Sequence, residues 1–379
     1  MNKNDRHGLR TWIEIDTKAI RSNYRAFRKF VPKSVQMMGV VKSNAYGHNI
    51  TEFALELEKL GVDMLAVDSL IEGIALRKSG VKIPVLVLGY TLPEMYARAL
   101  GKNIHLTISS VLGLKTFLKS SHSIKIPIHL KVDTGMHRQG FMPNEKEEVL
   151  NLLKKTGKKI KLAGLYTHFA SAKDPEDDVF TKKQIALFEA WRKVTTEEGF
   201  APVVHAGATG GLLAFRDAHF NMVRIGIGLY GVYPSESTEK FFKNEMNLKP
   251  VLTWKTVISE VKEIENGEGV GYDLTHRARG KSKIAVCPVG YWHGYPRALS
   301  NKGEVLVNGK RANVLGRVSM DMIVIDVTGM PNIKMGDEVV LIGAPEKDEI
   351  SATFLAERAG TSAYEILTRL NPLIKRIYR

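Results

Sequence analysis

The chain has 379 residues, enough for about two domains of ordinary size, and its apolar fraction of 44% is typical of a globular protein. A single cysteine, Cys287, excludes an intrachain disulfide and fits a reducing compartment. No stretch approaches about 18 consecutive apolar residues, and the basic N-terminus has no apolar core behind it. We therefore expect a cytoplasmic protein with no membrane partner.

The formal net charge is +15, from 55 basic and 40 acidic residues. Such a surplus can indicate binding to nucleic acid or to an anionic surface. The lysines are dispersed among glutamates over the predicted helices, however, and aromatic residues that could stack on bases do not alternate with them. We interpret the charge as a solvated basic surface that helps anionic ligands to arrive, and we expect no nucleic-acid partner.

The first half of the chain alternates short apolar strands with longer segments of helical period. A strand at 11–15 and a helix at 17–31 come first. Eight further strands are predicted at 37–42, 64–67, 85–89, 104–108, 126–132, 161–169, 203–207 and 222–228. Helices are predicted at 51–61, 70–80, 111–121, 145–155 and 181–199. The strands are apolar throughout, as parallel strands covered on both faces should be. This pattern predicts a TIM (β/α)8 barrel; an open doubly wound sheet is the alternative and would normally have fewer strands.

The pattern changes near Asn244, where short valine-rich strands separated by Gly/Asn turns begin. A hairpin turn is predicted at 307–310, and a helix at 352–360. These features indicate a second, mainly β domain at the C-terminus. The strand at 11–15 is one more than the barrel needs, so we assign it to that domain. The expected division is a barrel over 15–245 and a β domain formed by 1–14 and 246–379.

Polar residues follow several of the predicted barrel strands, at the end where barrel active sites lie. They are Lys42, Arg138, Tyr166, His168, His205 and Thr209, with Arg224 inside the last strand. Each alone has an ordinary structural explanation: a lysine at a strand end can reach solvent, and a histidine is more often a satisfied core residue. Arg224 is the hardest to explain in this way, because a buried guanidinium needs a partner. A desolvated lysine, in turn, loses basicity and can form a Schiff base.

Two glycine-rich segments lie at the last two barrel strands, GATGG at 207–211 and RIGIG at 224–228. Either one alone is a weak phosphate signal. Together they match the place where TIM barrels usually bind phosphate, with backbone N–H groups around a dianion. We therefore expect a phosphorylated ligand or cofactor there.

Eight segments of the chain resemble the alanine racemase family. They are VVKSNAYGH, KVDTGMHRQGF, GLYTHFA, NMVRIGIGLYG, GVGYD, PVGYWHGYPR, RVSMDMIVID and SAYEILTR. The resemblance covers nearly the whole chain. It implies an isomerase that uses pyridoxal 5'-phosphate to interconvert L- and D-alanine, supplies D-alanine for peptidoglycan, and works as a homodimer with shared active sites.

The resemblance also implies roles for individual residues. Lys42 is similar to the Schiff-base lysine that also serves as the base for D-alanine, and Tyr272, from the other subunit, to the base for L-alanine. Arg138 resembles the arginine that pairs with the cofactor phenolate and the substrate carboxylate. Met320 resembles the residue whose backbone faces that carboxylate, with Asp321 beside it. No metal is implied.

Further positions match the family's cofactor site. Those that fall where the family binds phosphate and ring are Tyr46, Thr209, Gly226, Ile227 and Tyr364. Arg224, held by His168, looks like the partner of the pyridine nitrogen; since arginine has no proton to give, the ring should stay unprotonated, which limits stray transamination. Tyr291 resembles a tyrosine that narrows the entrance, and Lys131 matches a lysine that is carbamylated in some members.

The chain departs from the family wording in places that affect the substrate range. His137 replaces a glycine, HAGATGG replaces an HxxNS wording at Ala208 and Thr209, and Trp292 and His293 stand where Ala and Asp are common. Alternatives are a broader amino-acid (serine) racemase and a pyridoxal-phosphate decarboxylase of the same architecture. Arg224 and the pair of Lys42 and Tyr272 argue against the decarboxylase. A pyridoxal-phosphate carrier built on a similar barrel is a non-enzymatic alternative, but such proteins lack the β domain.

Overall fold

The computed structural model describes residues 6–156, 160–176, 178–344 and 348–379. The chain forms two compact units. The barrel unit comprises Ile20–Ala45 and Ile50–Lys249. The β unit comprises the N-terminal segment through Ala19, Tyr46–Asn49 and Pro250–Arg379. The expected division at 14/15 and 245/246 lies a few residues from these limits, and it did not anticipate that Tyr46–Asn49 group with the β unit.

The barrel unit is built on eight parallel strands that close into a barrel, as the sequence predicts. The strands are β2 (Gln36–Val40), β3 (Met64–Val67), β4 (Val85–Val87), β5 (Ile104–Ile108), β6 (Ile128–Lys131), β7 (Leu162–Tyr166), β8 (Val203–His205) and β9 (Met222–Ile225). β9 pairs with β2, so the sheet has no open edge. Most strand residues are buried, because the barrel interior covers one face and the helices cover the other.

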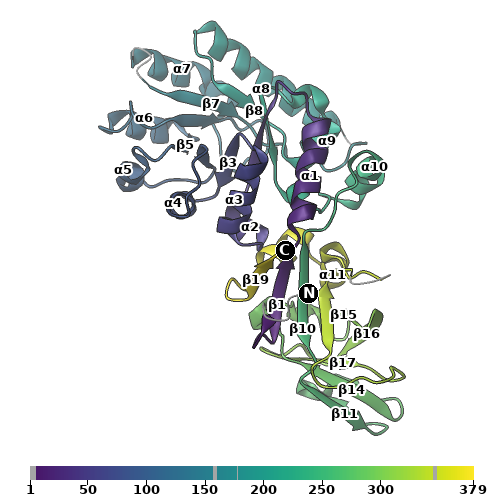
Figure 1. Cartoon of the computed structure of the whole chain (residues 1–379). Helices are drawn as coiled ribbons and strands as arrows, with labels where there is room; N and C mark the ends of the chain where they lie inside the picture. The colour runs from purple at the N-terminus through teal and green to yellow at the C-terminus, as the bar shows by residue number, and fades with distance from the viewer. Residues whose placement is uncertain (1–5, 157–159, 177, 345–347) are drawn as a thin grey trace. The chain divides into compact units, whose positions relative to one another are not determined.

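Helices surround these strands in Figure 1. They are α1 (Thr17–Phe30), α3 (Ile50–Leu60), α4 (Leu70–Lys78), α5 (Tyr96–Ala99), α6 (Val111–Lys119), α7 (Lys146–Lys155), α8 (Val179–Glu197), α9 (Thr209–Ala214) and α10 (Glu236–Met246). α4 begins with a capping box, in which the Ser69 hydroxyl accepts from Glu72 N–H and the Glu72 carboxylate accepts from Ser69 N–H. None of the helices in the described part of the chain combines the length and the apolarity that a bilayer span requires.

The β unit contains a nine-stranded sheet with the order β11-β14-β17-β16-β15-β18-β10-β1-β19. Its strands are β1 (Thr11–Ile15), β10 (Leu252–Val257), β11 (Glu260–Ile264), β14 (Ser282–Cys287), β15 (Glu304–Val307), β16 (Lys310–Leu315), β17 (Ile323–Asp326), β18 (Glu338–Ile342) and β19 (Lys375–Tyr378). β1 lies between β10 and β19, so the first and last strands of the described chain are neighbours in one sheet (Figure 1).

The remaining strands and α-helices of residues 250–379 are short. They are β12 (Gly269–Val270), β13 (His276–Arg277), α11 (Ala352–Ala359) and α12 (Ala363–Thr368). The predicted hairpin is confirmed: Val307 pairs with Lys310 across a turn in which Asn308 and Gly309 have positive φ. The segment 252–264 contains two strands, since β10 ends at Val257 and β11 begins at Glu260.

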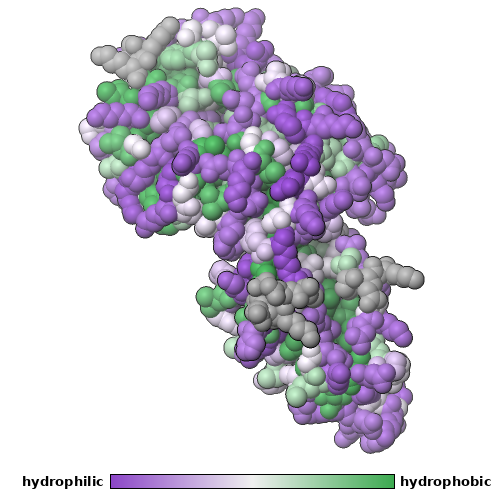
Figure 2. Space-filling view, in the orientation of Figure 1, coloured by the Kyte–Doolittle hydropathy of each residue, from purple (hydrophilic) through white to green (hydrophobic). Residues whose placement is uncertain are grey.

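Hydrophilic side chains are spread over the visible face of each unit, with apolar patches between them (Figure 2). Ion pairs accompany several of the surface lysines, for example Lys115 with Glu148 and Lys154 with Glu198. This distribution agrees with a solvated basic surface rather than with a continuous binding stripe.

Candidate active site

Lys42 follows β2 at the carboxyl end of the barrel and begins a short left-handed turn, α2 (Lys42–Tyr46). The φ angles of Ser43, Asn44, Ala45 and Tyr46 are 56°, 56°, 50° and 50°. Such backbone costs about 1–2 kcal/mol per non-glycine residue, so the surroundings must hold it. Glu72 does so in part, because its carboxylate accepts from Ser43 N–H at 2.8 Å. The turn fixes where the Lys42 side chain leaves the backbone.

Among the described residues, the carboxylate that pairs with the Lys42 ammonium is that of Asp68, which follows β3. Nζ of Lys42 lies 3.8 Å from Oδ1 of Asp68. Both side chains are substantially exposed, with fractions of 38% and 60%, so the pair is weak. The backbone turn fixes the start of the Lys42 side chain, whereas the pair with Asp68 holds Nζ only weakly. Nζ therefore remains available for chemistry.

Arg138 sits on a loop that Asp133 organises after β6. The Asp133 carboxylate accepts from the N–H groups of Gly135, His137 and Arg138 at 2.9–3.1 Å. Burial acts to raise the pKa of Asp133, but these backbone donors outweigh it and hold the pKa below its usual value. His137 takes a φ of 51° here.

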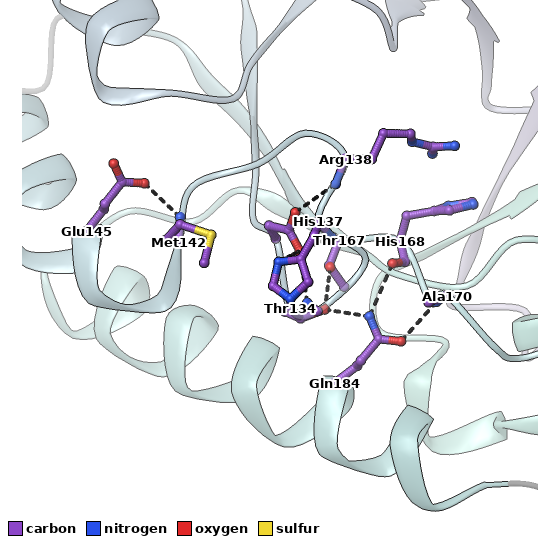
Figure 3. A network of polar contacts seen from close by, with 11 residues as sticks. Thr134, His137, Arg138, Met142, Glu145, Thr167, His168, Ala170 and Gln184 are labelled. Atoms are coloured by element: carbon purple, nitrogen blue, oxygen red, sulfur yellow. Dashed lines mark hydrogen bonds and ion pairs between the residues drawn. The ribbon is translucent and has the colours of Figure 1, made fainter.

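A second network orients the strand-end residue His168, which follows β7. The Gln184 amide bridges Thr134 Oγ1, His168 O and Ala170 N–H, and the Thr134 and Thr167 hydroxyls lie 2.8 Å apart. In Figure 3 the side chains of Arg138 and His168 extend to the same side of this network, away from Gln184. The loop after β6 and the end of β7 thus present a guanidinium and an imidazole in the same direction.

Arg224 in β9 is buried, and its hydrogen-bond partners in the described residues are all neutral. Nη1 lies 2.6 Å from Nδ1 of His205, and Nη2 donates to the carbonyls of Thr167 and Ala206 and lies 3.1 Å from Nδ1 of His168. Burial lowers the pKa of Arg224 to about 10, which still leaves it charged at neutral pH. The sequence predicts His168 as its holder; the structure adds His205 at a shorter distance.

The hydrogen bonds of Arg224 to other described residues involve Nη1 and Nη2 and leave Nε–H without an acceptor. Nε of Arg224 is not among the described buried nitrogens that lack a partner, so it is accessible to water or to a ligand. A ligand that brings a neutral nitrogen acceptor, such as an unprotonated pyridine ring, would satisfy it. This residue therefore fits pyridoxal phosphate with an unprotonated ring nitrogen.

Positive charge accumulates at this end of the barrel around Lys131, the last residue of β6. Burial, together with Arg138 and Arg224, lowers the pKa of Lys131 to about 8. Its Nζ lies 5.8 Å above the ring of Tyr166 and 3.4 Å from Oε1 of Gln139. Burial and the same two arginines also lower the pKa of His168 well below its usual value, so that imidazole is neutral. A polyanionic ligand would be strongly favoured here.

The two glycine-rich segments meet through Thr209, the first residue of α9. Its Oγ1 accepts from Gly226 N–H at 3.1 Å and from Gly228 N–H at 3.4 Å. The Thr209 hydroxyl donates to none of the other described residues, so its hydrogen can be donated to a ligand oxygen. Two short helices begin here, α9 at Thr209 and a 3₁₀ turn at Ile227, and the first N–H groups of a helix have no partner within it. These groups are suited to hold a phosphate.

Replacing Thr209 by valine tests this arrangement. The change keeps the shape but removes the hydroxyl that would donate to the phosphate, and a hydrogen bond to a charged group contributes about 1.5–3 kcal/mol. We expect the affinity for pyridoxal phosphate, measured by fluorescence titration, to fall at least about tenfold. The matched control is Thr209→Ser, which retains the hydroxyl and should stay near wild type. Equal affinities in T209V and T209S would contradict a phosphate role for this hydroxyl.

Other predicted site residues belong to the β unit. Tyr46 lies near Tyr364 of α12, with ring centroids 6.2 Å apart. Burial raises the pKa of both phenols, to about 12 for Tyr364, so both are protonated donors at neutral pH. Phenol O–H groups can donate to a phosphate oxygen.

Tyr272 and the substrate-side residues lie on exposed loops of the β unit. Tyr272 follows Gly271, and the next residue, Asp273, pairs with Arg317 at 2.7 Å. Tyr272 is 68% exposed and Met320 is 55% exposed in the single chain. The loop that carries Tyr291 is tied to the one that carries Met320 and Asp321, through Trp292 N–H to Met320 O at 3.0 Å.

The structure also contains residues near the site that the sequence does not single out. They include Asp68 beside Lys42, Asp133 beneath Arg138, and His129, which contacts His205. The sequence feature that could have indicated His129 is its place in the otherwise mostly apolar strand IPIHLKV. Asp68 and Asp133 carry the ordinary signal of a carboxylate after a strand, which many structural residues share.

The barrel is closed, a lysine lies just beyond its first strand, two short helices begin after its last two strands, and the second unit is mainly β. Together these features define a class: barrel-fold enzymes that use pyridoxal phosphate. The family models for the N-terminal and C-terminal domains of alanine racemase match residues 15–234 and 251–378. An alanine racemase of Halothermothrix orenii is 40% identical over 378 residues, covering 97% of each chain.

Solved structures agree. The alanine racemase of Bacillus anthracis with bound L-Ala-P has a TM-score of 0.90 and 34% identity, covering 98% of this chain and 95% of its own. That of Bartonella henselae with covalently bound pyridoxal phosphate has a TM-score of 0.86 and 27% identity, covering 98% of this chain and 100% of its own. The chain belongs to the alanine racemase family, whose members are pyridoxal-phosphate-dependent isomerases.

Proposed function

We propose that this chain interconverts L- and D-alanine by a two-base mechanism, with Lys42 acting on D-alanine and Tyr272 of the partner subunit on L-alanine. The observation that carries the proposal is Arg224: a buried cation with two nitrogens on neutral acceptors and an Nε–H that lacks one among the described residues. This arrangement suits a ring nitrogen that must stay unprotonated. When bound, pyridoxal phosphate supplies the electron sink that makes the substrate Cα–H acidic.

The residues of the barrel unit would hold this cofactor through complementary charges. Lys42 Nζ would link to it covalently, the N–H groups around Thr209, Gly226 and Ile227 would bind the phosphate, and Arg224 would face the ring nitrogen. Arg138 would bind the substrate carboxylate bidentately, as planar guanidinium groups do. Tyr46 and Tyr364 are proposed to donate to the phosphate.

Racemisation requires a proton to leave one face of Cα and a proton to arrive on the other. Lys42 Nζ and Tyr272 Oη would exchange these protons, each as base in one direction and acid in the other. Met320 and Asp321 are proposed to contact the substrate carboxylate, and Tyr291 to narrow the entrance and so restrict larger amino acids. Lys131, among cations, is proposed to support Arg138 and can do so better as a carbamate than as an ammonium.

A homodimer is part of the proposal because Tyr272 is well exposed in the single chain. The exposed large apolar residues of the β unit include Leu274, Tyr291, Trp292, Met320 and Met322. Exposed apolar groups of this size are characteristic of protein–protein interfaces. We also propose a cytoplasmic location and a supply of D-alanine for peptidoglycan.

The direct test is trapping on Lys42. Purified protein should absorb visible light, and borohydride reduction followed by peptide mapping should place a pyridoxyl label on Lys42, with loss of L-to-D conversion by chiral chromatography. Lys42→Arg keeps the charge and should carry no label. A label without racemisation would favour a carrier, and release of CO₂ from an amino acid would favour a decarboxylase.

A further inference from the structure

Three histidines inside the barrel form a continuous chain that ends on Arg224. His105 comes from β5, His129 from β6 and His205 from β8. Nδ1 of His105 lies 3.0 Å from Nε2 of His129, and Nδ1 of His129 lies 3.0 Å from Nε2 of His205. Nδ1 of His205 lies 2.6 Å from Nη1 of Arg224. His129 and His205 therefore each contact one neighbour through Nδ1 and the other through Nε2, and His105 contacts His129 through Nδ1.

The direction of every hydrogen bond in this chain follows from Arg224. A guanidinium can only donate, so Nδ1 of His205 must accept and its proton sits on Nε2. That Nε2–H donates to Nδ1 of His129, whose own proton is then on Nε2 and donates to Nδ1 of His105. One charged donor thus fixes the same tautomer in all three rings.

The three imidazole rings remain neutral, as this series of hydrogen bonds requires. Burial, His105 and Arg224 lower the pKa of His129 well below its usual value, and burial, Arg224 and His129 do the same for His205. At the outer end, burial followed by Arg77 and Lys161 lowers the pKa of His105 to about 4. An added proton anywhere would set two N–H groups against each other.

The surrounding barrel strands leave space that fits these imidazole rings specifically. A Cβ at Gly164 of β7 would lie 2.0 Å from Nδ1 of His129, so only glycine admits this imidazole in its present position. The ring of Tyr166, two residues further along β7, stacks on His205 with centroids 4.8 Å apart and an interplanar angle of 9°. The histidines are therefore held in place rather than filling space by default.

We propose that His105, His129 and His205 form one positioning array, in which a single tautomer is fixed along the chain and the Arg224 guanidinium is held in the orientation that directs its Nε toward the cofactor. His129 and His105 touch neither Arg224 nor the proposed ligand, so they act through His205. If His205 adopted the other tautomer, its Nδ1–H would oppose Nη1 and turn the guanidinium. The inference rests on the proposed function, but the array itself is tested without activity.

The first test is ¹⁵N NMR of histidine-labelled holoenzyme near pH 7.5. We expect three neutral rings protonated on Nε2, and N–H···N scalar couplings from His205 to His129 and from His129 to His105. The ¹⁵N signals of His105 are assigned as those that are missing from the spectrum of H105N. A proton on Nδ1 of His129 or His205, or a charged ring among the three, would overturn the array whatever the protein catalyses.

The second test compares H105L, which removes the acceptor at the outer end, with H105N, whose Oδ1 can replace Nδ1. In H105L we expect the coupling between His205 and His129 to weaken and kcat for alanine racemisation to fall about fivefold, as for loss of one neutral hydrogen bond. KM should stay within about twofold, since uniform substrate binding is not affected. H105N should restore kcat and the coupling.

A glycine pair extends the comparison to the middle of the array. Gly164→Ala should displace His129, abolish both couplings and lower kcat more than H105L does. Gly73→Ala on α4 is the matched control, because its added Cβ meets nothing closer than 3.4 Å. Intact couplings in H105L and G164A, or an equal loss of kcat in H105L and H105N, would overturn the positioning role. Intact couplings with no racemase activity in the wild type would instead overturn the proposed function alone.

Discussion

Lys42→Ala and Tyr272→Phe homodimers should each lose at least about 10³-fold in racemase activity, yet a mixture of the two should recover activity. The loss follows because each homodimer lacks one proton-transferring group at both sites, and such groups contribute about 10²–10⁴-fold. In a heterodimer, the site that uses Lys42 of one subunit and Tyr272 of the other is intact. Random exchange should give about a quarter of the wild-type sites.

Activity after mixing is measured by chiral chromatography, with subunit exchange verified by native mass spectrometry. Tyr272→Phe keeps the exposed aromatic ring and removes only the hydroxyl, so dimerisation should survive. The control is each variant incubated alone under the same exchange conditions, which should stay inactive. Verified heterodimers of K42A and Y272F that stay inactive would place Tyr272 outside the partner's site.

Arg224→Glu should change which reaction the enzyme performs as well as slow it. The guanidinium has no proton to give, whereas a carboxyl group can share one with the pyridine nitrogen. A protonated pyridine ring draws electrons from the substrate more strongly. The proton should then be added to a cofactor carbon more often, instead of returning to the substrate Cα. We expect a raised ratio of transamination to racemisation, measured as pyruvate formed per D-alanine formed.

The same change removes the donor that His205 Nδ1, Thr167 O and Ala206 O now share, so racemisation should fall by at least about 10²-fold from misplacement alone. Arg224→Lys separates the two effects, because lysine keeps the charge but lacks the planar fork. It should be slow with an unchanged product ratio. A ratio in R224E equal to that of R224K would show that residue 224 does not control the ring nitrogen.

The sequence alone determined the barrel and much of the list of candidate residues. Eight apolar runs separated by helix-period segments leave few architectures, because parallel strands must be covered on both faces. The Asn308–Gly309 turn was readable because its positive φ angles favour those residue types. Lys42 and Thr209 were found because strand ends in a barrel converge, and Arg224 because a cation in an apolar strand demands a partner.

Only the tertiary structure decided how these side chains are oriented. The left-handed turn at Ser43–Tyr46 runs against the preference of its residues and is held by Glu72, which is 29 positions from Ser43. His129 and His205 are 76 positions apart, and each alone reads as a core histidine. Periodicity reports only which face of an element is buried, whereas a hydrogen bond between strands depends on the register with which the barrel closes. Proton positions in the histidine array follow from that register and from one guanidinium that can only donate.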